Sequence, residues 1–219
     1  LETRDFAVES VAFSPDGSLV ATSARDGKVH LWRAADRTLL RTLEAPNAST
    51  KEPYSYAVAF SPDGTILALG LPDGTVRLWH VSDGSPVRTL EGRYGTVCSL
   101  AFSPDGQLLA VGSYNGVIEL WQVADGQLAR EFSDHAGRVL GLAFSPEGAY
   151  LASAALDGTA KLWRVADGVL VHTVEKGPVP TGIAFTPDGS MLAINHQLWR
   201  LEDWTALREM DPLRGGWVT

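Results

Sequence analysis

A segment of about 42 residues recurs five times along this chain of 219 residues, and no other feature restricts the fold as strongly. Each copy has a phenylalanine that closes its first apolar run and a tryptophan in its third. The phenylalanines are Phe13, Phe60, Phe102, Phe144 and Phe185, and the tryptophans are Trp32, Trp79, Trp121, Trp163 and Trp199. An aspartate follows four residues after each tryptophan, at Asp36, Asp83, Asp125, Asp167 and Asp203. Repetition of this kind predicts small units that bury their apolar faces by stacking on one another.

The copy from Leu142 to Gly168 shows what one unit encodes. Its apolar runs at 142–144, 151–154 and 160–165 are followed in turn by Ser-Pro-Glu-Gly, Leu-Asp-Gly and Ala-Asp-Gly. Proline presets the first central residue of a turn and glycine accepts positive φ, so the runs should pair as hairpins. With the apolar run that follows, each copy predicts four strands of one antiparallel sheet, named a to d here.

A sheet that is apolar on both faces needs cover on both, and identical units supply it by packing radially as blades. We therefore predict an all-β fold, a β-propeller of four-stranded antiparallel blades, with five blades in one domain or propeller segment. The expected blades are 1–44, 45–91, 92–133, 134–175 and 176–211, with a tail at 212–219. Residues 45–56 predict an enlarged surface loop, and the fifth copy shortens its b–c turn to about Asn195–His196.

Composition argues against several functions. The formal net charge is −8 and the 18 Lys and Arg residues are scattered, whereas a nucleic-acid binder normally carries a basic stripe. No apolar run approaches the roughly 20 residues that a membrane span needs. The single Cys98 excludes an internal disulfide and a Cys-based zinc site, and the five histidines show no paired metal spacing. We predict no cofactor, no metal and no nucleic-acid or membrane partner. The compartment is not readable, although a cytoplasmic location is favoured.

The repeats resemble the WD-repeat β-propeller family over residues 1–210. The resemblance is carried by Phe-Ser-Pro-Asp-Gly, Leu-Ala-Ser and Asp-Gly-Thr-Val-Arg-Leu-Trp at the period described above. The turn sequences are similar to those of the bacterial branch of the family. One departure is constant, because the residue after the tryptophan is never Asp; it is Arg33, His80, Gln122, Arg164 or Arg200.

The resemblance implies a hydrogen-bonded set of His, Ser or Thr, Asp and Trp inside each blade. Only the fourth copy has all four residues, namely His135, Ser153, Asp157 and Trp163. The first copy has Thr22, Asp26 and Trp32 with Arg4 in place of His, and the third has Val111 and Asn115. We expect the fourth blade to be the most rigid. Ser153, His135 and Asp157 could also be read as a hydrolase triad, but that needs an accessible cleft and an oxyanion hole, so the structural role is favoured.

The resemblance also implies a binding face that carries the d–a and b–c loops. Three positions per blade point there: six and four residues before the phenylalanine, and one before the b–c Asp. The predicted partner-binding residues are Arg25, Tyr54, Tyr56, Tyr114, Arg138, Leu140 and Leu156. Tyr and Arg are enriched in binding hot spots. The predicted function is a non-enzymatic scaffold or sensing module that binds a protein or peptide.

Two other functions stay open at this point. A propeller hydrolase or lyase would place acids, His or Ser at the central channel, where the strand-a ends are apolar here. The chain could also be a purely structural segment of a larger signalling protein. Members of the family usually have seven blades, and Leu1 aligns with Leu90 at the end of a strand d. We therefore expect about two further blades, from the parent chain or from a second chain.

Overall fold

The computed structural model describes residues 8–24, 27–45, 57–175, 182–195 and 197–209, and in this part of the chain every regular element is a β-strand. Twenty strands of the described residues form five sheets, called blades 1 to 5 in chain order. Blade 1 consists of β1 (Val8–Phe13), β2 (Leu19–Ala24), β3 (Lys28–Arg33) and β4 (Leu39–Glu44). Blade 2 consists of β5 (Val58–Phe60), β6 (Ile66–Gly70), β7 (Thr75–His80) and β8 (Pro86–Glu91).

Blade 3 consists of β9 (Val97–Phe102), β10 (Leu108–Ser113), β11 (Ile118–Gln122) and β12 (Leu128–Phe132). Blade 4 consists of β13 (Val139–Phe144), β14 (Tyr150–Ala155), β15 (Thr159–Arg164) and β16 (Leu170–Glu175). Blade 5 consists of β17 (Ile183–Phe185), β18 (Met191–Ile194), β19 (Gln197–Arg200) and β20 (Ala206–Glu209). Within each blade the strands pair antiparallel in chain order, which confirms the predicted all-β architecture of four-stranded blades.

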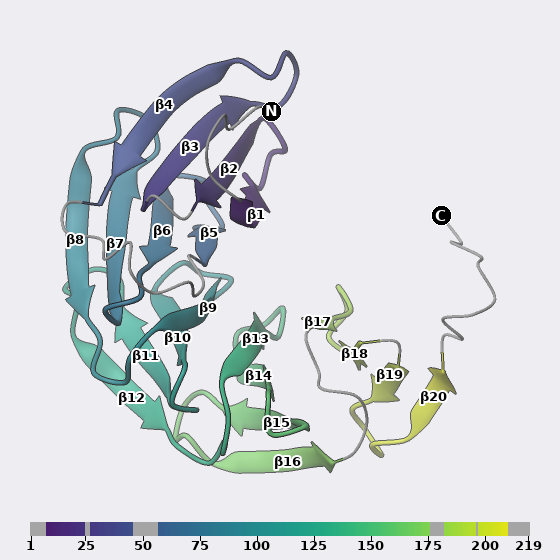
Figure 1. Cartoon of the computed structure of the whole chain (residues 1–219). Helices are drawn as coiled ribbons and strands as arrows, with labels where there is room; N and C mark the ends of the chain where they lie inside the picture. Colours follow the sequence, from purple (N-terminus) through teal and green to yellow (C-terminus); the bar gives the residue numbers. More distant parts are fainter. Residues whose placement is uncertain (1–7, 25–26, 46–56, 176–181, 196, 210–219) are drawn as a thin grey trace.

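The blades follow one another around an arc, with the first strand of each blade toward the centre and the last toward the outside (Figure 1). The arc is open between blade 1 and blade 5, whose sheets face each other across the opening (Figure 1). The loops that join strand d to the next strand a, and strand b to strand c, lie together at one end of each blade.

The Ser-Pro-Asp-Gly turns between strands a and b are held by their own side chains. In blade 1, Ser14 Oγ donates to Asp16 Oδ1 at 2.6 Å, and the backbone N–H of Leu19 donates to Ser14 Oγ at 2.9 Å. Gly17 closes the turn with φ of 70°, a conformation that glycine adopts without steric cost. The Ser14 and Ser18 donors lower the pKa of Asp16 to about 2. The turn therefore satisfies its own polar groups, which explains why this tetrapeptide recurs.

The fifth blade has a shorter b–c hairpin, as its sequence predicts. Ile194 pairs with Gln197, and Asn195 takes the left-handed conformation with φ of 51°. Asparagine tolerates this conformation better than most residues because its short polar side chain can bond locally. The enlarged loop predicted over residues 45–56 lies almost entirely outside the described residues.

The apolar core is divided into four clusters, one at each junction between successive blades. At the first junction Trp79 of blade 2 shares a cluster with Leu31 and Leu43 of blade 1, and all three are buried. The tryptophan and phenylalanine of blades 2 to 5 thus face the preceding blade. Burial of a tryptophan against such a face contributes on the order of 4–6 kcal/mol as an upper bound.

Blades 1 and 5 have faces that no described blade covers. Phe13 is 64% exposed, whereas Phe60, Phe102 and Phe144 are half-buried against the preceding blade. Leu198 of blade 5 is half-buried, although the residues at the same place in the other blades are all buried. The uncovered faces are therefore those that a neighbouring blade would occupy.

Candidate functional site

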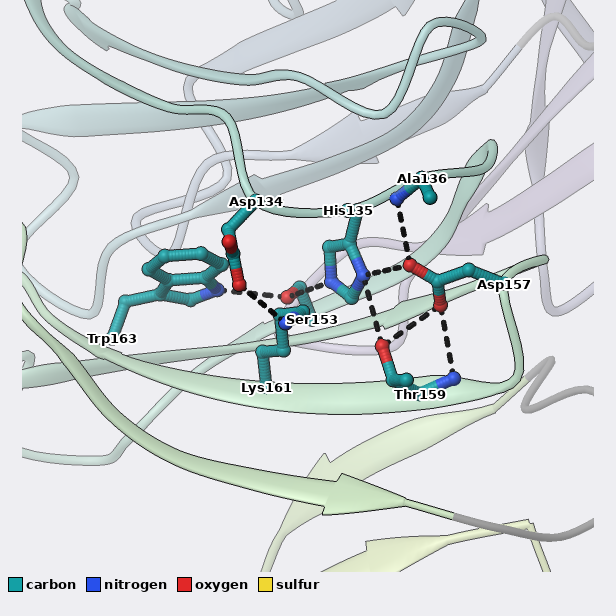
Figure 2. Close-up of polar contacts among 8 residues, drawn as sticks. All are labelled: Asp134, His135, Ala136, Ser153, Asp157, Thr159, Lys161 and Trp163. Carbon is teal, nitrogen blue, oxygen red and sulfur yellow. Dashed lines mark hydrogen bonds and ion pairs between the residues drawn. The ribbon is translucent and has the colours of Figure 1, made fainter.

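A chain of polar side chains crosses the inside of blade 4 (Figure 2). Trp163 Nε1 donates to Ser153 Oγ at 2.8 Å, and Ser153 Oγ lies 2.7 Å from His135 Nε2. His135 Nδ1 lies 2.9 Å from Asp157 Oδ2. The residues come from β14, β15, the d–a loop and the b–c turn, so the chain of hydrogen bonds connects both loops to the sheet. The structure therefore brings together all four residues of the predicted tetrad.

Donor and acceptor chemistry assigns the protons in this chain. The indole N–H can only donate and an ionised carboxylate can only accept. His135 therefore carries its proton on Nδ1 and donates a hydrogen bond from it to Asp157, while Nε2 accepts a hydrogen bond from the Ser153 hydroxyl. Burial lowers the pKa of His135, against an opposing effect of the Asp157 carboxylate, so the neutral imidazole is favoured.

The carboxylate of Asp157 is held at the b–c turn by several donors. Both the backbone N–H and the hydroxyl of Thr159 donate to Oδ1, at 2.9 and 2.8 Å, and the backbone N–H of Ala136 donates to Oδ2 at 2.9 Å. Partial burial acts to raise the pKa of Asp157, but the hydrogen bonds from Thr159, His135 and Ala136 outweigh it and lower the pKa to about 2. Asp157 is therefore a structural acceptor that ties together two loops.

This arrangement does not provide an accessible nucleophile. Ser153 is fully buried, and its oxygen already accepts the indole proton of Trp163. The side chain of His135 has no exposed surface. A substrate carbonyl would need to reach Ser153 through the packed blade, so the geometry favours internal bracing over hydrolysis.

An ion pair extends the polar chain of blade 4. Lys161 Nζ lies 2.5 Å from Asp134 Oδ2, and Lys161 is only 8% exposed (Figure 2). Asp134 precedes His135 in the d–a loop, so the pair fastens that loop to β15. This contact was not predicted from the sequence, because neither Asp134 nor Lys161 belongs to the predicted tetrad.

The other blades have only parts of this arrangement within the described residues. In blade 1, Trp32 Nε1 donates to Thr22 Oγ1 at 3.0 Å, while Arg4 and Asp26 lie outside the described residues. In blade 3, Val111 stands where blade 4 has Ser153, and the buried Trp121 Nε1 has no partner in hydrogen-bonding geometry. The buried Trp199 Nε1 of blade 5 is also without one.

Blade 3 has a buried carboxylate beside the Trp121 indole, whose N–H acts to lower the pKa of that carboxyl. Glu119 is 2% exposed, and its Oε1 accepts the backbone N–H of Arg93 at 3.2 Å. Burial raises the pKa of Glu119, with the Arg93 hydrogen bond opposing it. The d–a loop of blade 3 is therefore held to β11 by Glu119 instead of a histidine.

The predicted partner-binding residues of blades 3 and 4 meet at the loop end of these blades. Arg138 Nη2 donates to Tyr114 Oη at 2.8 Å, and its guanidinium carbon lies 4.0 Å from the centroid of the Tyr114 ring. Tyr114 is 38% exposed and Leu156 is 47% exposed, and the Leu156 N–H donates to the Arg138 carbonyl at 2.8 Å. Leu140 lies in β13 and is half-buried. Tyr114, Arg138 and Leu156 are called the blade 3–4 patch below.

Three predicted binding residues, Arg25, Tyr54 and Tyr56, lie outside the described residues. Cys98 lies near the blade 3–4 patch and is half-buried. Burial raises the pKa of its thiol to about 11, against an opposing effect of the Arg138 charge. The thiol is therefore protonated at neutral pH and unreactive.

Two further kinds of site are absent from the part of the chain that the structure describes. No group of three or more His, Cys, Asp or Glu side chains there could hold a metal ion. Nor does that part contain a helix long and apolar enough to cross a membrane.

The stacked four-stranded sheets and the polar chain of blade 4 define a repeat protein of the propeller type. Four segments of the sequence, residues 2–33, 37–80, 84–122 and 126–164, match the family model described as WD domain, G-beta repeat. These segments make up well over half of the chain, which therefore belongs to the WD-repeat family. The match is to the family as a whole, so a bacterial branch stays a prediction. No curated protein matches the chain.

Proposed function

We propose that this chain is a non-enzymatic interaction module that binds a protein or peptide at the blade 3–4 patch. Proteins built from this repeat generally bind protein partners, which supports the general function. The observation that carries the proposal is the contact between Tyr114 and Arg138, which joins two blades at the loop end. A guanidinium held over a ring is already ordered before a partner arrives, so binding costs less side-chain entropy.

The composition of the patch fits protein recognition. Tyr and Arg are the side-chain types most enriched in hot spots, and the exposed Leu156 adds apolar surface beside them. Arginine is a side-chain type that often binds the carboxylates of partner proteins. As part of a larger signalling protein, such a module would act as a scaffold or sensor.

The hydrolase alternative is less well supported than binding. A site at the central channel, for a hydrolase or lyase, would need acids, His or Ser at the strand-a ends, which are apolar here. A triad built on Ser153 and His135 is disfavoured as well, because both side chains are inaccessible and have their hydrogen bonds satisfied inside blade 4. In a purely structural segment, replacement of Tyr114 or Arg138 would change no binding affinity. The experiment below distinguishes such a segment from a binding module.

The test captures partners with the full chain and with a variant that combines Tyr114→Ala, Arg138→Ala and Leu156→Ser. Proteins retained by the unmodified chain are identified and their affinities measured with both forms. We expect the triple variant to lose at least about tenfold in affinity, because truncation of hot-spot residues costs more than 1 kcal/mol each. A matched control, Val171→Ser, changes an exposed apolar residue on the outer strand of blade 4.

Equal binding by the triple variant would contradict the proposed face. A second variant, Tyr54→Ala with Tyr56→Ala, tests the two tyrosines of the enlarged loop separately. Loss of binding in that variant alone would move the site to blade 2.

A further inference from the structure

Three of the four blade junctions share an arginine contact that was not predicted from the sequence. The guanidinium of Arg41 in β4 donates to the carbonyls of Ser82 and Asp83, in the c–d turn of blade 2. Arg88 in β8 donates to Ala124 and Asp125 of blade 3 at 2.8 and 2.6 Å. Arg130 in β12 donates to Ala166 and Asp167 of blade 4 at 2.7 and 2.8 Å. Each arginine lies nine residues after the tryptophan of its blade.

We call this contact the arginine clasp, and the position nine residues after the tryptophan the clasp position. The clasp depends on a glycine in the c–d turn of the next blade. Gly84, Gly126 and Gly168 have φ of 74°, 72° and 79°. A Cβ at these glycines would lie 2.5, 2.5 and 2.8 Å from the Cδ of the clasping arginine. The arginine could yield only by shifting the guanidinium that its two hydrogen bonds hold. A side chain at this turn position is therefore incompatible with the clasp.

The fourth junction changes both members of the pair together. His172 takes the place of the arginine in β16, and Trp204 takes the place of the glycine in the c–d turn of blade 5. Trp204 keeps the left-handed conformation, with φ of 55°. The two rings stack with centroids 3.8 Å apart and planes 11° apart. At this junction a side chain fills the turn position, and the preceding blade presents an aromatic ring.

Blade 1 has a filled turn position and an exposed inner strand that no described blade covers, while Trp32 of the same blade is 7% exposed. Arg37 occupies the place of the glycine, with φ of 62°, and is exposed. On the same side of the arc, Val11 is 60% exposed and Phe13 is 64% exposed, although the corresponding residues of blades 2 to 4 are covered by the preceding blade. The face of blade 1 therefore continues the series of four junctions, but with the turn chemistry of the fourth.

We infer that the face of blade 1 docks a further four-stranded blade that presents an aromatic side chain at the clasp position, and that Arg37 rejects a blade with arginine there. A guanidinium stacks well on an aromatic ring, whereas an arginine opposite Arg37 would meet both its side chain and its charge. The occupant is therefore unlike blades 1, 2 and 3, which present arginine.

The same reasoning bears on a second copy of this chain as the occupant. The register of β20 pairs Arg208 with Leu198, as Arg41, Arg88 and Arg130 pair with the leucines of their own blades. Blade 5 of another copy would thus also have arginine at the clasp position of its last strand, as blades 1, 2 and 3 do. Arg37 disfavours assembly of copies through the face of blade 1, and so acts against self-association.

The test adds one blade to the full chain. Residues 134–173 are placed in frame ahead of Leu1, because Leu1 aligns with Val174 in the repeat. The added blade carries either His or, through His172→Arg in that copy alone, Arg at the clasp position. Each form is combined with Arg37 or with Arg37→Gly, and the chain without an added blade is measured for both residues at position 37. This gives two matched pairs, His with Arg37 and Arg with Gly, and two mismatched pairs.

Stability in repeat proteins is close to a sum of blade and junction contributions, so a docked blade raises the stability of its neighbour. We expect the matched pairs to unfold at a urea midpoint at least about 0.3 M above the mismatched pairs. The parent chains correct for the intrinsic effect of glycine at position 37. The pairing would be overturned if the same clasp residue, His or Arg, gave the higher midpoint both with Arg37 and with glycine at position 37. Midpoints equal to those of the parent chains in all four proteins would show that the face docks no blade.

A second measurement stays within the described junctions. His172→Arg alone and Trp204→Gly alone should each lower the midpoint, while the double variant should recover at least half of the combined loss by restoring the clasp. Strictly additive losses would contradict the pairing of these two positions.

Discussion

Trp163 donates its indole N–H to Ser153 at 2.8 Å inside a blade where Ser153 has no exposed surface. The serine hydroxyl in turn donates a hydrogen bond to His135 Nε2. One hydroxyl thus satisfies two buried groups, the indole N–H and the imidazole nitrogen. No other blade shows this full arrangement among the described residues. The stability of blade 4 should therefore depend strongly on Ser153.

Ser153→Ala should lower the free energy of unfolding by about 1–3 kcal/mol, because it leaves the Trp163 N–H and His135 Nε2 buried without partners. Urea denaturation followed by tryptophan fluorescence would measure the loss. Ser82→Ala is the control, since Ser82 is exposed in a c–d turn. A loss no larger than that of the control would show that the hydroxyl does not brace the blade.

The stability of the chain should fall as the pH drops below neutral, in part through His135. Burial lowers the pKa of His135 in the folded state below the value of 6.5 that applies to the unfolded chain. The unfolded state therefore binds a proton at higher pH than the folded state does. The contribution is fully present above pH 6.5 and is lost as the pH falls through 6.5 toward the folded pKa.

His135→Gln should flatten this dependence, when the free energy of unfolding is measured at intervals between about pH 7 and 5. Some slope should remain, because burial also lowers the pKa of His172. His80→Gln, at an exposed position, serves as the control for loss of a histidine. A variant as pH-dependent as the unmodified chain would contradict the burial of a neutral His135.

Protonation of Asp157 should cause a second loss of stability, at a lower pH. Its hydrogen bonds hold its pKa at about 2 in the folded state, against the ordinary value of 3.8. The resulting stability is present above pH 3.8 and is lost as the pH falls through about 2. Asp157→Asn should reduce this step in acid titrations that follow the near-UV circular dichroism, but not remove it. Hydrogen bonds also hold the pKa of Asp16, Asp36 and Asp188 at about 2. An unchanged acid transition would show that other carboxylates set it.

Much of this fold can be predicted from the sequence, because it depends on local signals that repeat. Turns of the Ser-Pro-Asp-Gly kind, the short apolar runs and the tryptophan at a fixed offset recur in every blade. The blade 3–4 patch was also predicted in part, since Tyr114 and Arg138 occupy defined loop positions. Their direct contact was not predicted, because it joins two blades.

The arginine clasps show what sequence reasoning missed. Arg41, Arg88 and Arg130 recur at one offset, and that signal was available. Their acceptors are backbone carbonyls, however, which every residue has, so no residue type marks the other side of the contact. On the acceptor side, only the glycine of the turn is a residue type that the contact requires. The positive φ of the turn already explains a glycine there, so it does not point to the arginine.

Replacement of the central tryptophan by alanine should strongly destabilise blade 4. Trp163 is 3% exposed and packs against Phe132 with ring centroids 5.2 Å apart. Trp163→Ala should therefore cost about 3–5 kcal/mol, as the removal of a large core side chain does. Trp199→Ala in blade 5 should cost less, because Trp199 is only half-buried. A loss under about 1 kcal/mol for Trp163→Ala would refute the packing of blade 4 on blade 3.

The clasp can be tested with one methyl group. Gly126→Ala combines two effects, a left-handed φ of 72° and a Cβ that would lie 2.5 Å from Arg88 Cδ. Gly17→Ala is a matched control, since Gly17 has φ of 70° and a Cβ added there would meet no atom within 4 Å. The control should lose about 1 kcal/mol from backbone strain, and Gly126→Ala should lose about 1–2 kcal/mol more, because the Arg88 hydrogen bonds must break. In an Arg88→Ala background the two glycine substitutions should cost the same. A persistent difference there would mean that the cost of Gly126→Ala does not arise from the clasp.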